Sequence, residues 1–395
     1  MRRPHLAIIG SGPSGLDAAL AAADRGWDFT LYEAGPAAST GVRAWGHVPL
    51  FTPWSMDVSP RMARHLAAAG HPVPTGNVCP TGKELVDRLL APVGDLPEVA
   101  TSVRYGARIV AIGRQGLLKH EEIASAVRAA RPFRLLVATS DGEEVASADV
   151  VIDCSGTYGR PNCAGDGGIP ALGEVALADR IVRAIPDVTT DTAAWAGKRV
   201  LLVGSGHSAQ TAAASLAALD GTEVIWAVRS VEPTWGAVEH DPLPARAALT
   251  GEAQRLAAGG ASGLELRTGV VVDGFAVDGD RIVATLRNGN TQEVVVDRVV
   301  SLTGYVGDNS VYRQLQVHEC YATSAPMNLS AALLGATAGD CLQQESHKVD
   351  VLRNPEPNFY ILGAKSYGRN NQFLMRIGWE QVDQVVEALA GDLAW

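Results

Sequence analysis

A glycine-rich turn occurs twice in this chain, each time between a short apolar run and an alanine-rich run. In the first copy, His5–Ile9 is followed by Gly10-Ser11-Gly12-Pro13-Ser14-Gly15 and by an Ala/Leu-rich stretch that extends to about Arg25. This order predicts a buried parallel strand, a tight turn and a helix. The helix N-terminus offers free N–H groups and a partial positive charge, so the unit is suited to bind a pyrophosphate.

A second strand, Phe29–Tyr32, completes the first copy, and Glu33 ends it. The position of Glu33 is close to that expected for a carboxylate that binds the ribose hydroxyls of a dinucleotide. We therefore predict a first dinucleotide site. Its residues are Gly10, Ser11, Gly12, Pro13, Ser14, Gly15, Glu33 and Ala34.

The second copy begins with the apolar run Val200–Val203 and continues through a helix to about Leu219 and a strand at Glu223–Val228. Its strand ends not in an acid but close to Arg229. A guanidinium can pair with a 2′-phosphate that a carboxylate would repel, so we predict NADPH rather than NADH. The alternative is that Arg229 is a solvated surface arginine. The predicted contacts are Gly204, Ser205, Gly206, His207, Ser208 and Arg229.

Two further strand-to-turn segments divide the chain. Val150–Cys154 leads into Ser155-Gly156-Thr157, and Asp297–Leu302 leads into Thr303-Gly304-Tyr305. We expect Gly156, Thr303, Gly304 and Tyr305 to pass close to a cofactor. The prediction is an α/β fold with two Rossmann-like domains, the second at 159–304 inserted into a first at 1–158 and 305–395. Each half also contains a hairpin signal, at 133–148 and at 275–286.

Bulk composition excludes several classes of protein. The 395 residues are enough for two cores, and the net charge of −10 argues against a nucleic-acid or membrane-surface partner. No apolar run approaches the ~20 residues of a membrane span, and the strand at His5 leaves no room for a signal peptide, so we expect a cytoplasmic protein. The sequence contains five scattered cysteines and no C-x-x-C pair, which excludes a disulfide framework. The histidines and cysteines of 306–350 fit no zinc pattern, so we predict no metal.

Together these features resemble the two-dinucleotide-binding flavoproteins. The chain looks most like flavin-containing monooxygenases, N-hydroxylases and bacterial relatives, some of them associated with arsenic resistance. The segments that carry this resemblance are Trp45–Trp54, which is similar to a flavin-facing loop, Thr303-Gly304-Tyr305, and Asn358–Gly363 with Lys365–Arg369. The resemblance implies FAD at the first site and the nicotinamide cofactor at the second.

Candidate catalytic residues follow from that resemblance. We consider His47 as a general acid or base, with a structural histidine as the alternative. Trp45 and Trp54 are expected to wall the flavin and exclude water, or else to be ordinary core residues. Gly363, Lys365, Tyr367 and Arg369 are expected beside the cofactor, with a solvated basic loop around Lys365–Arg369 as the alternative. We expect Asn370 or Asn371 to cap the last helix, so that its N-terminus favours negative charge on the flavin.

The main functional hypothesis is an NADPH-dependent FAD monooxygenase that oxygenates nitrogen, sulfur or arsenic in a small molecule, with O2 as co-substrate. The F-x-G-x-x-x-H fingerprint of flavin-containing monooxygenases is absent, since Tyr158-Gly159-Arg160 follows Thr157. This departure keeps open an FAD- and NAD(P)H-dependent reductase or dehydrogenase. A third hypothesis is a non-catalytic redox-sensing flavoprotein. The oligomeric state is not predicted.

Overall fold

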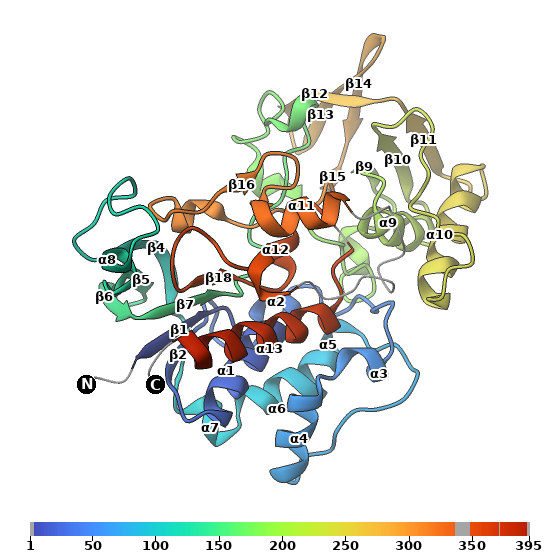
Figure 1. Ribbon diagram of the computed structural model, residues 1–395. Coiled ribbons are helices and arrows are strands. Elements are labelled where there is room, and N and C mark those ends of the chain that lie inside the picture. Colours follow the sequence, from blue (N-terminus) through green and yellow to red (C-terminus); the bar gives the residue numbers. More distant parts are fainter. Residues whose placement is uncertain (1–3, 336–347, 371, 393–395) are drawn as a thin grey trace. The chain divides into compact units, whose positions relative to one another are not determined.

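The computed structural model describes residues 4–335, 348–370 and 372–392. The chain forms two compact units, each with its own sheets and core (Figure 1). Unit 1 consists of Met1–Arg160 and Val306–Trp395, and unit 2 of Pro161–Tyr305. Which dinucleotide each unit binds is not a property that the fold alone shows, so that assignment stays a prediction.

Unit 1 is built on a parallel five-stranded sheet of order β18-β7-β1-β2-β3. Its strands are β1 (His5–Ile9), β2 (Asp28–Tyr32), β3 (Val103–Arg104), β7 (Val150–Asp153) and β18 (Phe359–Ile361). Helix α1 (Pro13–Asp24) joins β1 to β2, and Pro13 at its start has a φ angle suited to a first helical turn. The chain returns to this sheet after unit 2, because β18 pairs with β7.

The two faces of this sheet are covered differently. Leu6 and Ile8 of β1 belong to one buried cluster, and Ala7 and Ile9 belong to another, as the two-residue period of a strand requires. An antiparallel sheet covers the face of Ala7 and Ile9; it consists of β4 (Arg108–Arg114), β5 (Phe133–Thr139) and β6 (Gly142–Ala148).

Helices cover the other face of the sheet. Helix α13 (Met375–Asp392) lies beside α1 and buries Ile377, Val385 and Leu389, which the sequence places on one apolar stripe (Figure 1). The remaining helices of this unit are short: α2 (Thr40–Arg43), α3 (Trp54–Asp57), α4 (Pro60–Ala68), α5 (Gly82–Leu85), α6 (Ala91–Gly94), α7 (Pro97–Ala100), α8 (Ala126–Ala129), α11 (Met327–Gly335) and α12 (Ala364–Tyr367).

Unit 2 repeats the plan of unit 1. Its parallel sheet has the order β11-β10-β9-β15-β8. The strands are β8 (Ile181–Val182), β9 (Arg199–Val203), β10 (Glu223–Val228), β11 (Leu264–Thr268) and β15 (Arg298–Ser301). Helix α9 (His207–Ala217) joins β9 to β10, and α10 (Pro244–Ala257) precedes β11. A second antiparallel sheet contains β12 (Val271–Asp278), β13 (Arg281–Asn288) and β14 (Asn290–Val296).

The predicted fold class is confirmed: each unit is a Rossmann-like α/β fold around a parallel sheet. In both units a three-stranded antiparallel sheet directly precedes a strand that pairs with the first strand of the βαβ unit: β7 pairs with β1 in unit 1, and β15 pairs with β9 in unit 2. No helix in the described ranges is long and apolar enough to span a bilayer.

Candidate functional site

The first glycine turn has the geometry that a pyrophosphate site requires. Gly10 has φ +91°, and a Cβ built on it would lie 2.7 Å from the carbonyl oxygen of Cys154. A Cβ on Gly15 would lie 1.8 Å from the Gly10 carbonyl oxygen, so any side chain there would push α1 away from β1. Gly12, at the N-cap of α1, has open space around its built Cβ. The turn is therefore closed toward the protein and open at Gly12.

Glu33 is held against this turn. Its Oε2 accepts hydrogen bonds from the Ser11 amide at 3.0 Å and the Ser11 hydroxyl at 2.5 Å, and its Oε1 accepts from the Gly35 amide at 2.8 Å. The carboxylate is 8% exposed. Ser39 extends the network, since its hydroxyl donates to the Ser11 carbonyl and its amide to the Ser11 hydroxyl. Ala34 is exposed next to it.

The C-terminal segment returns to the same turn. A Cβ built on Gly363, which has φ +72°, would lie 2.8 Å from Ser14 Oγ, and one on Gly378 of α13 would lie 2.4 Å from it. The start of α13 is tied down by Gln381, whose Oε1 accepts from the Gly363 amide at 2.9 Å. The structure thus brings Gly363 to Ser14, and it adds Gly378, which the sequence analysis does not single out.

Lys365 forms a buried ion pair. Its Nζ is buried and donates to Asp153 Oδ2 at 2.6 Å, to Ser155 Oγ at 3.1 Å and to the Asp308 carbonyl at 2.9 Å. An ammonium group has three N–H donors, and all three are used inside unit 1. Lys365 therefore balances the buried Asp153 carboxylate.

The loop Trp45–Trp54 contains polar atoms that the described protein leaves unsatisfied. Nε1 of half-buried Trp45 and Nε2 of His47 are buried and have no hydrogen-bond partner among the described residues. The Trp45 ring lies 5.8 Å from that of Tyr158, centroid to centroid. Trp54 is 3% exposed and stacks under the Arg88 guanidinium. Buried unsatisfied polar atoms of this kind indicate that a further group belongs beside the loop.

The segment before the last helix departs from the prediction at Asn370. Asn370 does not cap the last helix, because α13 begins at Met375 and Asn370 Oδ1 instead accepts from the Gln372 amide. Arg369 is exposed and donates to Ser324 Oγ at 3.3 Å. The other proposed cap, Asn371, lies outside the described residues, as do Cys341 and His347.

Tyr367 packs inside the core of unit 1, with its ring 5.4 Å from that of Phe373. Burial raises its pKa to about 12. A phenol with this pKa stays protonated at neutral pH, so Tyr367 can act as a hydrogen-bond donor but is not a base. Its hydroxyl is buried and has no partner within the described part of the chain.

The second glycine turn repeats the geometry of the first. Gly204 has φ +126°, and a Cβ built on it would lie 2.3 Å from the Leu302 carbonyl oxygen. Gly206, the N-cap of α9, has open space at that position. Ala209 fits where the first turn has Gly15, since its Cβ stays 3.5 Å from a Cβ built on Gly204.

No carboxylate plays the part of Glu33 in the second turn, among the described residues. The Ser205 carbonyl accepts from Gln210, and the Gly204 carbonyl accepts from the Trp226 indole. Arg229 follows β10 directly and is exposed. Burial and the nearby Arg246 guanidinium lower the pKa of His207, the first residue of α9, so its imidazole is neutral at neutral pH.

The second crossing turn is fixed inside unit 2. Asn162 donates from Nδ2 to the Thr303 carbonyl and from its amide to the Gly304 carbonyl, while the Thr303 hydroxyl donates to the Asn162 carbonyl. Gly304 has φ +90°. The hydroxyl of Tyr305 donates to the Arg183 carbonyl, and burial raises its pKa.

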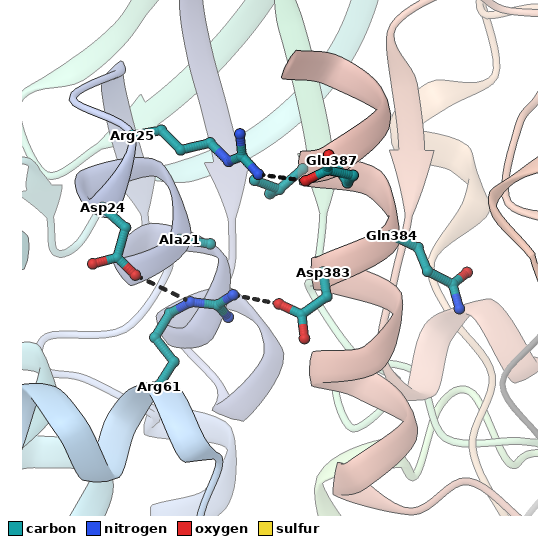
Figure 2. A pocket seen from close by; sticks show the side chains of 8 residues that line it. Ala21, Asp24, Arg25, Arg61, Asp383, Gln384 and Glu387 are labelled. Atoms are coloured by element: carbon teal, nitrogen blue, oxygen red, sulfur yellow. Dashed lines mark hydrogen bonds and ion pairs between the residues drawn. The ribbon is translucent and has the colours of Figure 1, made fainter. Parts of the chain in front are cut away.

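A cavity of about 590 Å³ between α1, α4 and α13 is lined mainly by charged residues (Figure 2). Arg25 pairs with Glu387 at 2.7 Å, and Arg61 joins Asp24 to Asp383. Both guanidinium groups are therefore neutralised. The cavity lies at the C-terminal end of α1, away from the glycine turn at its N-terminal end, and we assign it no ligand.

The residues of unit 1 fit a bound dinucleotide, because Gly10 and Gly15 hold the turn close to the protein while Gly12 leaves open space at the N-terminus of α1. A sequence profile of the family described as pyridine nucleotide-disulphide oxidoreductase matches residues 4–320. The chain belongs to this family. Its cofactors are accordingly FAD and NAD(P)H, and it is a flavin-dependent oxidoreductase.

Solved structures share the fold of this family member across almost its whole length. Bacillithiol disulfide reductase Bdr from Bacillus cereus has 18% identity and a TM-score of 0.68 and covers 99% of this chain and 100% of its own. Ornithine N-hydroxylase from Kutzneria sp. 744, in a structure with FAD, NADP+ and L-ornithine, has 15% identity, a TM-score of 0.65 and coverage of 98% and 100%. No curated protein matches the sequence. At these identities the likeness shows the fold, which reductases and monooxygenases share.

Proposed function

We propose that this flavoprotein is an NADPH-dependent monooxygenase that transfers one oxygen atom to nitrogen, sulfur or arsenic in a small molecule. The observation that carries the proposal is the missing dithiol. The five cysteines include no C-x-x-C pair, and burial raises the pKa of the fully buried Cys154 thiol, which makes it a poor nucleophile. Electrons taken from NADPH therefore have no adjacent protein disulfide to reduce and pass to a small molecule.

The bound cofactors supply hydride transfer and oxygen activation. In the overall reaction, substrate, NADPH, a proton and O2 give the oxygenated substrate, NADP+ and water. In unit 1 we propose that Trp45 and Trp54 limit the access of water and that His47 and Tyr367 donate hydrogen bonds from their unsatisfied atoms. Arg369 is exposed, and we propose for it contact with substrate rather than with the flavin.

We propose further that Arg229 selects NADPH. It stands at the end of β10, in the position that Glu33 occupies after β2, and it is exposed. A charge-assisted bond to a 2′-phosphate is worth ~1.5–3 kcal/mol, and the lower half of that range applies to an exposed arginine. R229A should raise the Kd for NADPH ~10-fold and leave that for NADH unchanged. The matched control is R255A, which removes an exposed arginine of the same unit that pairs with Glu252.

The second candidate is an NAD(P)H-dependent disulfide reductase acting on a small disulfide. It is favoured by the full-length similarity to bacillithiol disulfide reductase. In that reaction NADPH, a proton and a disulfide give NADP+ and two thiols. A redox sensor without turnover is the third candidate.

The test mixes the FAD-loaded protein with NADPH, first without oxygen and then with it, while NADPH, O2 and peroxide are counted. A substrate screen covers amines, thiols, arsenite and small disulfides, with ¹⁸O2 used to trace the transferred atom. One ¹⁸O atom per NADPH in the product supports the monooxygenase. Anaerobic NADPH oxidation that depends on a disulfide refutes it and supports the reductase. Absence of flavin reduction by NADPH supports the sensor.

A further inference from the structure

Asp57, the last residue of α3, is a buried carboxyl group with only one satisfied oxygen. Its Oδ1 accepts a hydrogen bond from the Thr52 hydroxyl at 2.6 Å. Its Oδ2 is buried and has no hydrogen-bond partner among the described residues. The residue is 2% exposed. A buried carboxyl oxygen without a partner is costly, so a group from outside the described protein is expected beside it.

No charged side chain of the described ranges compensates this carboxylate. The two influences on its pKa are burial, which raises it to about 7, and the Thr52 hydrogen bond, which opposes the rise. The Cys79 thiol is a titratable group that responds to the charge of Asp57. Its pKa is raised by burial and by that charge. No described group on α1, α4 or α13 shifts the pKa of Asp57. A group with this pKa exchanges protons readily at neutral pH.

Asp17 shows what a purely structural buried aspartate looks like in the same unit. It is fully buried, as Asp57 is. One of its oxygens accepts from the Ser59 hydroxyl at 2.6 Å, and the other pairs with the Arg61 guanidinium. Both oxygens of Asp17 are therefore satisfied inside the protein, whereas Asp57 Oδ2 is left for another partner.

The position of Asp57 connects it to the dinucleotide site of unit 1. Two residues further on, Ser59 is bonded to Asp17 of α1, the helix that begins at the glycine turn. Helix α3 also packs against α13, whose Gly378 lies against Ser14 of that turn. Asp57 directly continues the segment 45–54, whose Trp45 and His47 carry the other unsatisfied atoms.

We propose that Asp57 is a proton-exchanging residue of this site, in which Thr52 fixes Oδ1 while Oδ2 gives a proton to, or takes one from, a polar group of bound substrate or cofactor. The O–H bond at Oδ2 breaks as the proton binds the acceptor's lone pair, and no electrons are transferred. Oxygen transfer and disulfide reduction each consume one proton per NADPH. The proposal therefore holds for either function and does not depend on the monooxygenase assignment.

The test compares D57N with the wild type and with the matched control D17N, all loaded with FAD. The first readout is the infrared C=O band of a protonated carboxyl, recorded with and without cofactor. We expect a band that titrates near pH 7 in the wild type and in D17N. In D57N that band should be missing, so that only the carboxyl of Asp17, which titrates near pH 6, remains. A band that still titrates near pH 7 in D57N, or the absence of such a band from the wild type and D17N, would overturn the proposal.

The second readout is the pH profile of NADPH-driven turnover with O2 or a disulfide as acceptor. In D57N the turnover rate should no longer change with pH near pH 7. Below pH 7 the variant should turn over ~100-fold more slowly than the wild type, as expected for loss of a general acid–base group. In D57E the turnover rate should still change with pH. In T52V the change should occur at higher pH than in the wild type, because the hydrogen bond from Thr52 that lowers the pKa of Asp57 is gone. An unchanged profile in T52V would refute the role of Asp57 even if D57N does not fold. If the monooxygenase assignment is wrong, the product will contain no ¹⁸O from O2, but the pH dependence of turnover in these variants will be the same.

Discussion

The buried pair of Lys365 and Asp153 allows a sharp test of what this lysine does. The two side chains are each 1% exposed, and their charged atoms lie 2.6 Å apart. K365M keeps the unbranched stem that packs on Gly307 but removes the charge. The Asp153 carboxylate would then be buried without a counter-charge, which costs ~3–5 kcal/mol. Loss of the bond to the Asp308 carbonyl adds to this cost.

The double variant D153N/K365M is the matched control. The side-chain amide introduced by D153N retains an oxygen that can accept from the Ser155 amide, as the carboxylate does, and a neutral pair avoids the desolvation cost of two charges. We expect its stability to lie within ~1.5 kcal/mol of the wild type. Because the double change is neutral overall, we also expect unaltered FAD content and flavin absorbance.

The stability of unit 1 is measured by urea unfolding, with hydrogen exchange in peptides from β1 and β7 as the readout. Because both strands belong to unit 1, this readout is separate from the stability of unit 2. A loss below ~1 kcal/mol in K365M would show that the pair is not a desolvated ion pair. A double variant that is stable but has lost its flavin would show instead that Lys365 binds the cofactor, and a purely structural role for this lysine would be wrong.

Three further outcomes are expected. G378A should weaken FAD binding ~10-fold or more, because the added Cβ would lie 2.4 Å from Ser14 Oγ. G391A, which has open space on the same helix, should not weaken FAD binding. Titration of the apoprotein with FAD measures both affinities. E356Q leaves two fully buried arginines without their shared carboxylate and should lower stability by ~3–5 kcal/mol in thermal unfolding; a change below ~1 kcal/mol would contradict this. Burial raises the pKa of Asp17 to about 6, so the native state binds more protons than the unfolded chain between about pH 4 and pH 6, and its stability falls as pH rises through that window. Urea titrations should show D17N lacking this fall of ~3 kcal/mol; equal pH slopes would refute the shift.

The sequence was sufficient for the elements whose local pattern is strong. The strand at His5–Ile9 and the one at Glu223–Val228 have the predicted bounds, and both hairpins form. The third strand of each antiparallel sheet was not predicted. In β14 the first half is polar and exposed, so Asn290–Glu293 carries no strand signal of its own. Its partner β13 supplies the pairing, and pairing is a tertiary property.

The site residues also differ in whether a local sequence pattern or a distant partner determines their contacts. Glu33 could be placed because it follows the glycine turn at a known spacing, and it does contact that turn. The ion pair of Lys365 is not predictable from the sequence, because its partner Asp153 is 212 residues away, on a strand whose last residue gives no sign of charge pairing. The sequence predicts Asn370 or Asn371 as a helix cap because asparagine is a common one, but the helix begins at Met375, five residues after Asn370. The unsatisfied oxygen of Asp57 has no sequence signature at all.

The glycine turns of the two units have the same geometry. In both, the first glycine of the turn faces the carbonyl of the neighbouring crossing strand, at Cys154 in unit 1 and at Leu302 in unit 2. Neither turn can therefore accept a side chain there, whichever dinucleotide binds. The difference lies at the end of the next strand, where unit 1 buries Glu33 against the turn and unit 2 exposes Arg229. If unit 1 binds FAD and unit 2 binds NADPH, as we propose, the opposite charge at this one position changes the recognition of the ribose while the pyrophosphate cradle stays the same.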